Sequence, residues 1–104
     1  MKRIAFTMKL HKGAEEEYRK RHDAIWPELK TCLRDNGISD YSIFLDEASD
    51  MLFGSLKIED VSRMQELAAH PVMKRWWSFM KDLMETNPDD SPVSRPLKEV
   101  FYLK

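Results

Sequence analysis

Tyr18, His22 and Trp26 follow one another at intervals of four residues. On a helix this spacing places the three side chains on one face, one turn apart. They carry a hydroxyl, an imidazole and an indole N–H, and each needs a hydrogen-bonding partner when it is buried. Because imidazole exchanges a proton near neutral pH, His22 is the candidate for general acid–base chemistry. The alternative is a core histidine bonded to a backbone carbonyl, but a second titratable group beside it in a small core costs stability.

Further aromatic side chains can form the walls of a pocket beside this face. Trp76 and Trp77 are adjacent, so on a helix they point about 100° apart, and we expect one to pack into the core and the other to line a cavity. A tryptophan pair is more often core than ligand platform, and that alternative stands beside the functional one. Tyr41 shares a strand face with Ile43 and Leu45. Aromatic walls with one imidazole and few charges suit a neutral polar ligand such as a sugar.

Other kinds of site find little support in the sequence. Cys32, the single cysteine, falls on the apolar stripe of the first helical segment, and we interpret it as a small buried hydrophobe rather than a nucleophile. His11 and His70 stand at the ends of elements, where we expect them to be exposed, and the histidines show no metal-ligand spacing. There is neither a glycine-rich phosphate loop nor a G-x-S-x-G motif. We therefore expect no metal site.

The first half of the chain predicts a strand followed by a long helix. Apolar and polar residues alternate strictly over 3–10, which indicates a half-buried strand. A three- and four-residue apolar period predicts a helix over 14–36, and Gly37 suits the left-handed position after its end. Pro27 bends or breaks this helix just after Trp26, because proline clashes with the carbonyl four residues earlier.

The second half predicts a hairpin, a helix, a loop and a last strand. These segments cover, in order, residues 41–45 with 51–58, 60–84, 87–96 and 100–103. Asp60 or Ser62 can cap the helix, with Gln65 placed for a capping box on Ser62, and His70-Pro71 interrupts it. The loop holds three prolines in ten residues and is a candidate lid or dimer arm, or a plain connection.

The predicted order is β-α-β-β-α-β, the split βαβ pattern of ferredoxin-like α+β folds. We expect residues 1–104 to form a single domain, with a four-stranded antiparallel sheet and both helices on one of its faces. Strands such as the last one offer apolar side chains to both faces, so the uncovered face needs a partner. The simplest partner for this face is a second copy of the chain. We predict a homodimer whose sheets face each other.

Composition excludes several classes of partner. The 104 residues include 17 basic and 18 acidic side chains, spread evenly along the chain. This balance argues against nucleic-acid binding and against attraction to a membrane surface. A single cysteine excludes an intrachain disulfide framework and favours a reducing cytoplasm. No apolar run is long enough for a signal peptide or a membrane span.

The chain resembles the L-rhamnose mutarotase family from end to end. Five blocks carry the similarity: E-E-Y-R-K-R-H-D-A-I-W-P-E-L (16–29), Y-S-I-F-L-D (41–46), R-W-W-S-F-M-K-D-L-M (75–84), N-P-D-D-S-P-V (87–93) and E-V-F-Y-L (99–103). Together they are far more specific than any single motif. The resemblance implies a dimeric α/β barrel that interconverts the α and β anomers of L-rhamnose without a cofactor.

The resemblance also implies roles for individual residues. In this family the histidine of the R-H-x-x-I-W-P stretch within the first block is the proton donor, which is His22 here. Tyr18, Tyr41, Trp76 and Trp77 match the residues that bind the sugar. The chemistry agrees, since mutarotation needs the ring oxygen protonated and the anomeric hydroxyl deprotonated, and acid–base groups alone supply both steps.

Two other classes of function stay open at this point. One is another small dimeric α+β-barrel enzyme, either a cofactor-free monooxygenase or a haem-degrading protein, since these also use histidine and tryptophan pockets. The other is a non-catalytic module that senses a sugar, in which His22 is only a hydrogen-bonding partner.

Overall fold

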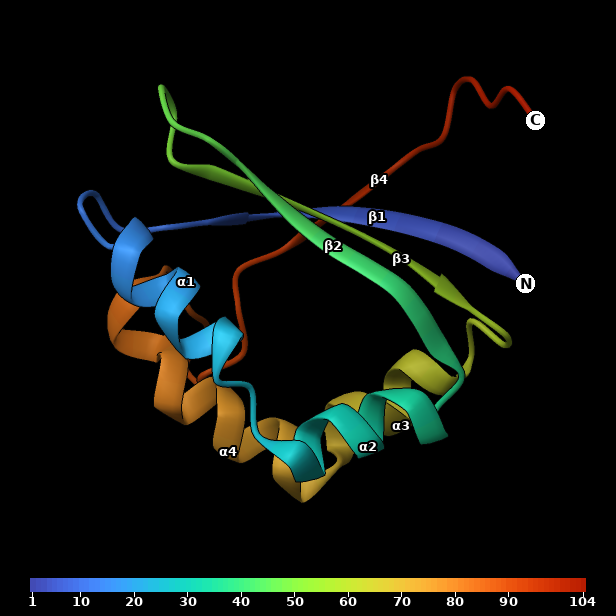
Figure 1. The fold of residues 1–104 in the computed structure, drawn as a ribbon, viewed down its shortest axis with the longest axis horizontal. Coiled ribbons are helices and arrows are strands. Elements are labelled where there is room, and N and C mark those ends of the chain that lie inside the picture. The colour runs from blue at the N-terminus through green and yellow to red at the C-terminus, as the bar shows by residue number, and fades with distance from the viewer.

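Four helices lie against one face of a four-stranded sheet in the computed structural model, which describes residues 1–104 (Figure 1). The elements are β1 (Lys2–Lys9), α1 (Glu15–Asp23), α2 (Pro27–Asp35), β2 (Ile38–Asp46), β3 (Met51–Ile58), α3 (Arg63–Ala69), α4 (Pro71–Met80), a 3₁₀ turn η1 (Lys81–Leu83) and β4 (Arg95–Leu97). The strand order is β2-β3-β1-β4, and every neighbouring pair is antiparallel. The predicted ferredoxin-like α+β fold is confirmed.

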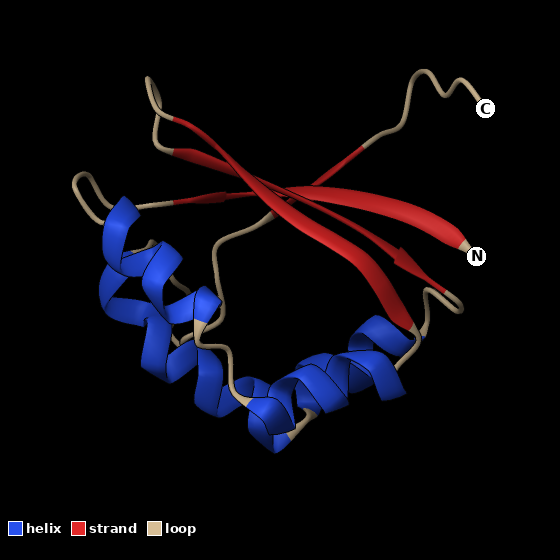
Figure 2. Cartoon of the chain, viewed as in Figure 1, coloured by secondary structure: helices blue, strands red, loops and turns tan.

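The helices and the sheet form two layers, which Figure 2 shows separately. Along β1 and β3 the side chains alternate, so that Ile4 pairs with Leu56 and Met8 with Leu52 on the face toward the helices. These residues belong to the same apolar cluster as the buried side chains of the helices, such as Leu29. The core therefore lies between the layers. No helix is long and apolar enough to cross a membrane.

Prolines divide each of the two expected helices. Trp26 and His70 have extended backbones, with ψ of 132° and 133°, because a residue before proline is pushed out of the helical region. Pro27 and Pro71 then begin α2 and α4, where the missing N–H costs nothing. Both predicted interruptions are confirmed, although α1 already ends at Asp23. The break lets α1 and α2 meet at an angle and follow the curve of the sheet (Figure 1).

The predictions for the helix ends have different outcomes. Gly37 has φ of 81°, so the left-handed position after α2 is confirmed. The capping box of Ser62 with Gln65 is wrong, because Ser62 is itself helical and makes no capping hydrogen bond. Its hydroxyl instead donates to Asp60 at 2.8 Å, and the Asp60 carboxylate also accepts the Ser62 backbone N–H at 3.0 Å.

The last strand does not lie where the sequence predicts it. β4 spans Arg95–Leu97, partly inside the expected loop over 87–96, and residues 98–104 form no regular element. Thr7 of β1 pairs with Arg95, so this short edge strand begins before the apolar run over 100–103. An edge strand tolerates Pro96, whereas a proline inside a central strand removes a ladder hydrogen bond. The apolar tail instead extends away from the sheet (Figure 1).

Candidate active site

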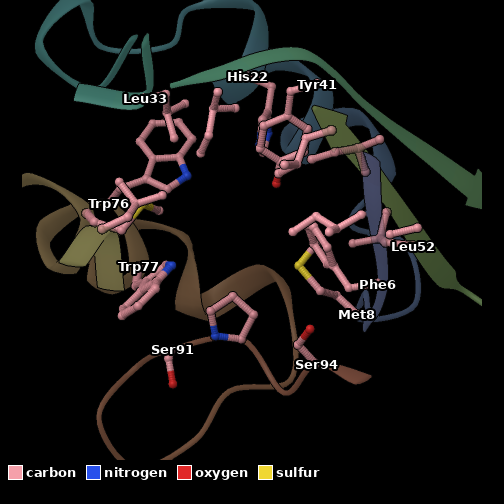
Figure 3. Close-up of a pocket in the computed structure, with 18 of the residues that line it drawn as sticks. Phe6, Met8, His22, Leu33, Tyr41, Leu52, Trp76, Trp77, Ser91 and Ser94 are labelled. Atoms are coloured by element: carbon pink, nitrogen blue, oxygen red, sulfur yellow. The ribbon is translucent and has the colours of Figure 1, made fainter. Parts of the chain in front are cut away.

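A cavity of about 960 Å³ lies between the sheet and the helices. Its wall is mostly apolar, with Phe6, Met8 and Leu52 contributed by the sheet. Figure 3 shows Trp76 and Trp77 along the opposite side and His22 with Tyr41 at one end. The segment after η1 closes a further side through Ser91, Pro92 and Ser94. The five residues that the sequence singles out for the site, which are Tyr18, His22, Tyr41, Trp76 and Trp77, all line this cavity.

Helix α1 presents Tyr18 and His22 together. Their ring centroids are 4.3 Å apart with a tilt of 31°. The imidazole Nδ1 lies 3.0 Å from the Tyr18 carbonyl oxygen. Since a carbonyl only accepts hydrogen bonds, Nδ1 carries the hydrogen, and Nε2 is the atom left for a proton transfer.

Trp26 does not join this face. Helix α1 ends at Asp23, so Trp26 lies beyond it at the start of α2 and its side chain takes another direction. The Trp26 ring packs edge-on against Trp76, with centroids 5.1 Å apart, and beside Phe79 at 5.4 Å. Trp26 therefore supports the cavity wall from behind.

The two adjacent tryptophans divide as expected. Trp76 is buried in the core, and its ring meets His22 edge-on at 5.4 Å. Trp77 is half-buried and lines the cavity. Because Trp76 also lines the cavity, its burial and a contact with a ligand are compatible.

A β-bulge between Ser39 and Ser42 sets the position of Tyr41. One extra residue is inserted there in β2 opposite β3, and Asp40 takes a φ of 48°. Bulges of this kind redirect side chains and are common beside functional sites. Tyr41 points into the cavity (Figure 3), where Phe6 meets its ring edge-on at 6.2 Å. The predicted inward face of Tyr41 is confirmed.

Burial shifts the pKa values of the three titratable groups that the sequence singles out. Burial lowers the pKa of His22, and the hydrogen bond to the Tyr18 carbonyl and the charge of Asp23 oppose this only in part. Burial raises the pKa of Tyr41 to about 12. It also raises the pKa of Tyr18, with a further contribution from Tyr41. Both phenols therefore stay protonated at neutral pH and act as hydrogen-bond donors.

The cavity-facing polar atoms are free to bind a ligand. The Tyr18 and Tyr41 hydroxyls, Nε2 of His22 and the indole N–H groups of Trp76 and Trp77 make no hydrogen bond within the chain. Every fully buried side-chain nitrogen or oxygen in the chain has a hydrogen-bonding partner. Because the five atoms named above have none, they are not fully buried and stay accessible from the cavity. A small molecule with several hydroxyl groups can satisfy them all.

Arg21 fastens α1 to the helix that carries the tryptophans. Its guanidinium donates to both carboxylate oxygens of Asp82, at 2.8 and 3.1 Å, and to the Phe79 carbonyl at 2.7 Å. It also binds Glu17 at 2.9 Å and lies 4.6 Å from the centroid of the Phe79 ring. This clamp keeps His22, the next residue, in register with α4.

Sequence reasoning did not single out Asp90. A smaller hollow of about 60 Å³ is lined by Asp90 together with Tyr18, His22 and Tyr41. The only local signal was the run of turn-forming residues around Pro88, which predicts a loop but not the direction of a side chain.

The remaining candidates lie outside the site. Cys32 is 6% exposed and burial raises its pKa, so its interpretation as a buried hydrophobe is confirmed. His11 and His70 are exposed as expected. The His70 imidazole accepts the Val72 backbone N–H at the start of α4.

Comparison with known proteins gives close relatives over the whole length. The sequence model of the L-rhamnose mutarotase family matches residues 3–103. An L-rhamnose mutarotase of Rhizobium meliloti is 57% identical over 104 residues, and one of Formosa agariphila is 53% identical over 104 residues, each covering 100% of both chains.

Solved structures agree with this result. The crystal structure of an L-rhamnose mutarotase from Formosa agariphila superposes with a TM-score of 0.93 at 51% identity, covering 100% of both chains. A dimeric ferredoxin-like protein from an uncultured marine organism has a TM-score of 0.58 at 11% identity, covering 97% of this chain and 96% of that one. The second likeness shows the fold alone.

Proposed function

The chain belongs to the L-rhamnose mutarotase family, and on that premise we propose that it interconverts the α and β anomers of L-rhamnose in the cavity between sheet and helices. One observation carries the proposal. Nε2 of His22, two phenol hydroxyls and two indole N–H groups meet in a cavity whose wall is mostly apolar, and none of them has a partner within the chain. A neutral sugar with polar edges and C–H faces matches this wall.

In the proposed reaction His22 is the proton donor. The protonated imidazole passes its Nε2 proton to the ring oxygen of the sugar while the anomeric hydroxyl loses its proton. The bond between C1 and the ring oxygen then breaks and leaves an aldehyde. Rotation about the C1–C2 bond exposes the other face of the carbonyl, and reversal of the proton transfers closes the ring. Because burial lowers the pKa of His22, its imidazolium is a stronger acid than free imidazolium.

The aromatic residues hold the sugar in this proposal. Tyr18 and Tyr41 donate hydrogen bonds from hydroxyls that burial keeps protonated. Trp77 offers a ring face to the C–H groups, and Trp76 adds an indole N–H at the back of the cavity. Positioning of this kind keeps the reacting oxygens near Nε2 through ring opening and closing.

Saturation-transfer NMR on L-rhamnose tests the function directly. Irradiation of the anomeric proton of one anomer transfers saturation to the other only if the two exchange on the timescale of relaxation. We expect strong transfer with the chain present and little in buffer alone. Binding of the sugar without transfer would instead indicate a sensing module, and it would overturn the proposal.

We also propose that the chain acts as a homodimer through the outer face of its sheet. No element covers that face (Figure 2). Phe44 and Phe53 are cross-strand neighbours there and are 67% and 39% exposed. Exposed apolar side chains at adjacent positions support a partner of the same kind. The exposed apolar residues over 100–103 enlarge the available surface.

A further inference from the structure

We propose that Asp90 is a second catalytic residue of this site, whose carboxylate accepts the proton of the anomeric hydroxyl while His22 donates to the ring oxygen. The inference rests on the proposed function and names the group that completes its acid–base pair. It starts from the position of Asp90 in the small hollow beside Tyr18, His22 and Tyr41.

Asp90 is the one carboxylate of a small hollow that shares much of its wall with the cavity. Twelve residues line this hollow of about 60 Å³. The same hollow is lined by Tyr18, His22 and Tyr41. A sugar bound against these side chains therefore lies between an imidazole on α1 and a carboxylate on the loop after η1.

The loop holds Asp90 in a backbone conformation that side chains rarely adopt. Its φ is 71°, in the left-handed region. The Asp90 N–H donates to the Asn87 carbonyl at 2.9 Å, and the Asn87 N–H donates to the Ser91 carbonyl at 2.7 Å. The Ser91 N–H is in turn bound by the Asp89 carboxylate at 3.0 Å. Strained residues held by such networks cluster at functional sites.

Contacts of the carboxylate tie it to the tryptophan helix and leave one oxygen free. The Ser78 hydroxyl donates to Oδ2 at 2.6 Å, and the Lys81 ammonium lies 3.7 Å from the same oxygen. No hydrogen bond or ion pair engages Oδ1. Since Ser78 follows Trp77 on α4, the carboxylate and the proposed sugar-binding tryptophans are positioned by one helix.

Mutarotation requires the acceptor that Asp90 supplies. The Nε2 proton of His22 goes to the ring oxygen, the bond between C1 and that oxygen breaks, and the O1 proton goes to Asp90 as the C1=O1 bond forms. Ring closure returns both protons to their donors, so no proton is gained or lost. The phenols of Tyr18 and Tyr41 are poor acceptors, because burial keeps them protonated. A carboxylate is the better base for this step.

The substitution Asp90→Asn tests the inference with little change of structure. Asparagine tolerates a left-handed φ, and its side-chain oxygen can still accept from Ser78, but it takes up no proton. We expect kcat for anomer exchange to fall by about 10²–10⁴-fold with KM nearly unchanged. The matched control is Asp35→Asn, which removes the same charge from an exposed side chain of α2 that lines neither the hollow nor the cavity. It should exchange anomers like the unaltered chain.

Chemical rescue provides a second, independent readout. Asp90→Gly also accepts the left-handed φ and leaves space for a small carboxylate. Added formate should restore part of kcat in Asp90→Gly and have no effect on Asp35→Asn. Circular dichroism and thermal unfolding establish whether each variant is folded. If Asp90→Asn does not fold, the effect of formate on Asp90→Gly by itself tests the role of Asp90.

The outcomes separate this inference from the proposed function. If the unaltered chain exchanges anomers and Asp90→Asn does so at the same kcat, the proposed catalytic role of Asp90 is overturned, while the proposed function of the chain stands. A loss confined to KM, or a loss in Asp90→Gly that formate does not relieve, also overturns it, because both indicate binding or structure only. If the unaltered chain exchanges no anomers, the proposed function fails first.

Discussion

His22 illustrates how one side chain is prepared by its surroundings. Its Nδ1 is bound to the Tyr18 carbonyl one helical turn earlier, and its ring lies between Tyr18 and Trp76. The imidazole therefore keeps a single orientation, and Nε2 is its reactive atom. Fixing the orientation of a general acid in this way contributes to catalysis, because the reacting groups must be held in the right geometry.

Replacement of His22 should abolish most of the activity. Asparagine can keep the hydrogen bond to the Tyr18 carbonyl, but it neither gains nor loses a proton near neutral pH. We expect His22→Asn to reduce the rate of anomer exchange by roughly 10²–10⁴-fold without unfolding the chain. Saturation-transfer NMR measures the rate, and circular dichroism checks the fold. A folded variant with near-normal exchange would show that another group donates the proton.

The same histidine makes stability depend on pH. Burial lowers the pKa of His22 below its ordinary value of 6.5, so between the two values the unfolded chain binds more protons than the folded one. The free energy of unfolding therefore decreases as pH falls from about 6.5 through the lower folded-state pKa of His22. Above pH 6.5 the imidazole is neutral in both states, and its burial then carries no cost from protonation. Tyr18, Asp23, Tyr41 and Asp90 are the titratable groups around it.

Urea denaturation at a series of pH values measures this dependence. His22→Asn removes the titrating group and should flatten the curve in that window, whereas His11→Asn, at an exposed histidine, should leave the slope unchanged. Equal slopes for the unaltered chain and His22→Asn would contradict the assignment.

At the scale of elements, the sheet supports the site through a glycine. On the inner face Gly54 of β3 lies opposite Phe6 of β1. A Cβ atom at Gly54 would stand 2.5 Å from Cζ and 2.7 Å from Cε2 of the Phe6 ring. Phe6 in turn contacts Tyr41 edge-on. The absence of a side chain at Gly54 thus allows Phe6 to lie flat and brace the bulge that carries Tyr41.

Gly54→Ala should disturb both packing and binding. The added methyl group pushes Phe6 toward the cavity, and overpacking of this kind costs about 1–3 kcal/mol in the free energy of unfolding. We expect KM for the sugar to rise more than kcat falls, because Tyr41 shifts while His22 keeps its place. Thermal unfolding and NMR exchange kinetics give the two quantities. The double variant with Phe6→Leu, which makes room for the methyl group, should recover most of the stability.

At the scale of the molecule, one face of the sheet is used and the other is left open. The helices and the inner face enclose the cavity, while Phe44 and Phe53 face outward. Closing that outer face in a dimer removes apolar area from water without touching the cavity-lining residues of the helices. Assembly and catalysis are thereby assigned to opposite sides of one sheet.

Light scattering at micromolar concentration tests the assembly. We expect the mass of a dimer for the unaltered chain and of a monomer for Phe44→Asp combined with Phe53→Asp, because facing carboxylates would be buried without partners. Lys30→Glu, on an exposed position of α2, serves as the control and should remain a dimer. A monomeric unaltered chain would rule out the proposed interface.

Local pattern was enough to determine the elements and much of the site. The strand over 2–9 follows from alternation, and the breaks at Pro27 and Pro71 follow from the missing N–H of proline. Tyr18 and His22 meet because four residues separate them on one helix. These features depend only on neighbours in sequence, so they can be read without knowledge of the fold.

Tertiary structure alone decided which distant residues meet. The apolar run over 100–103 has strong strand propensity, yet β1 pairs with Arg95–Leu97, because pairing depends on the partner strand and on the path of the preceding loop. Trp26 left the His22 face when α1 ended early. Asp90 reached the hollow beside His22 through a left-handed turn braced by Asn87 and Ser78. Loop geometry and long-range contacts set these positions, and neither leaves a periodic signal in the sequence.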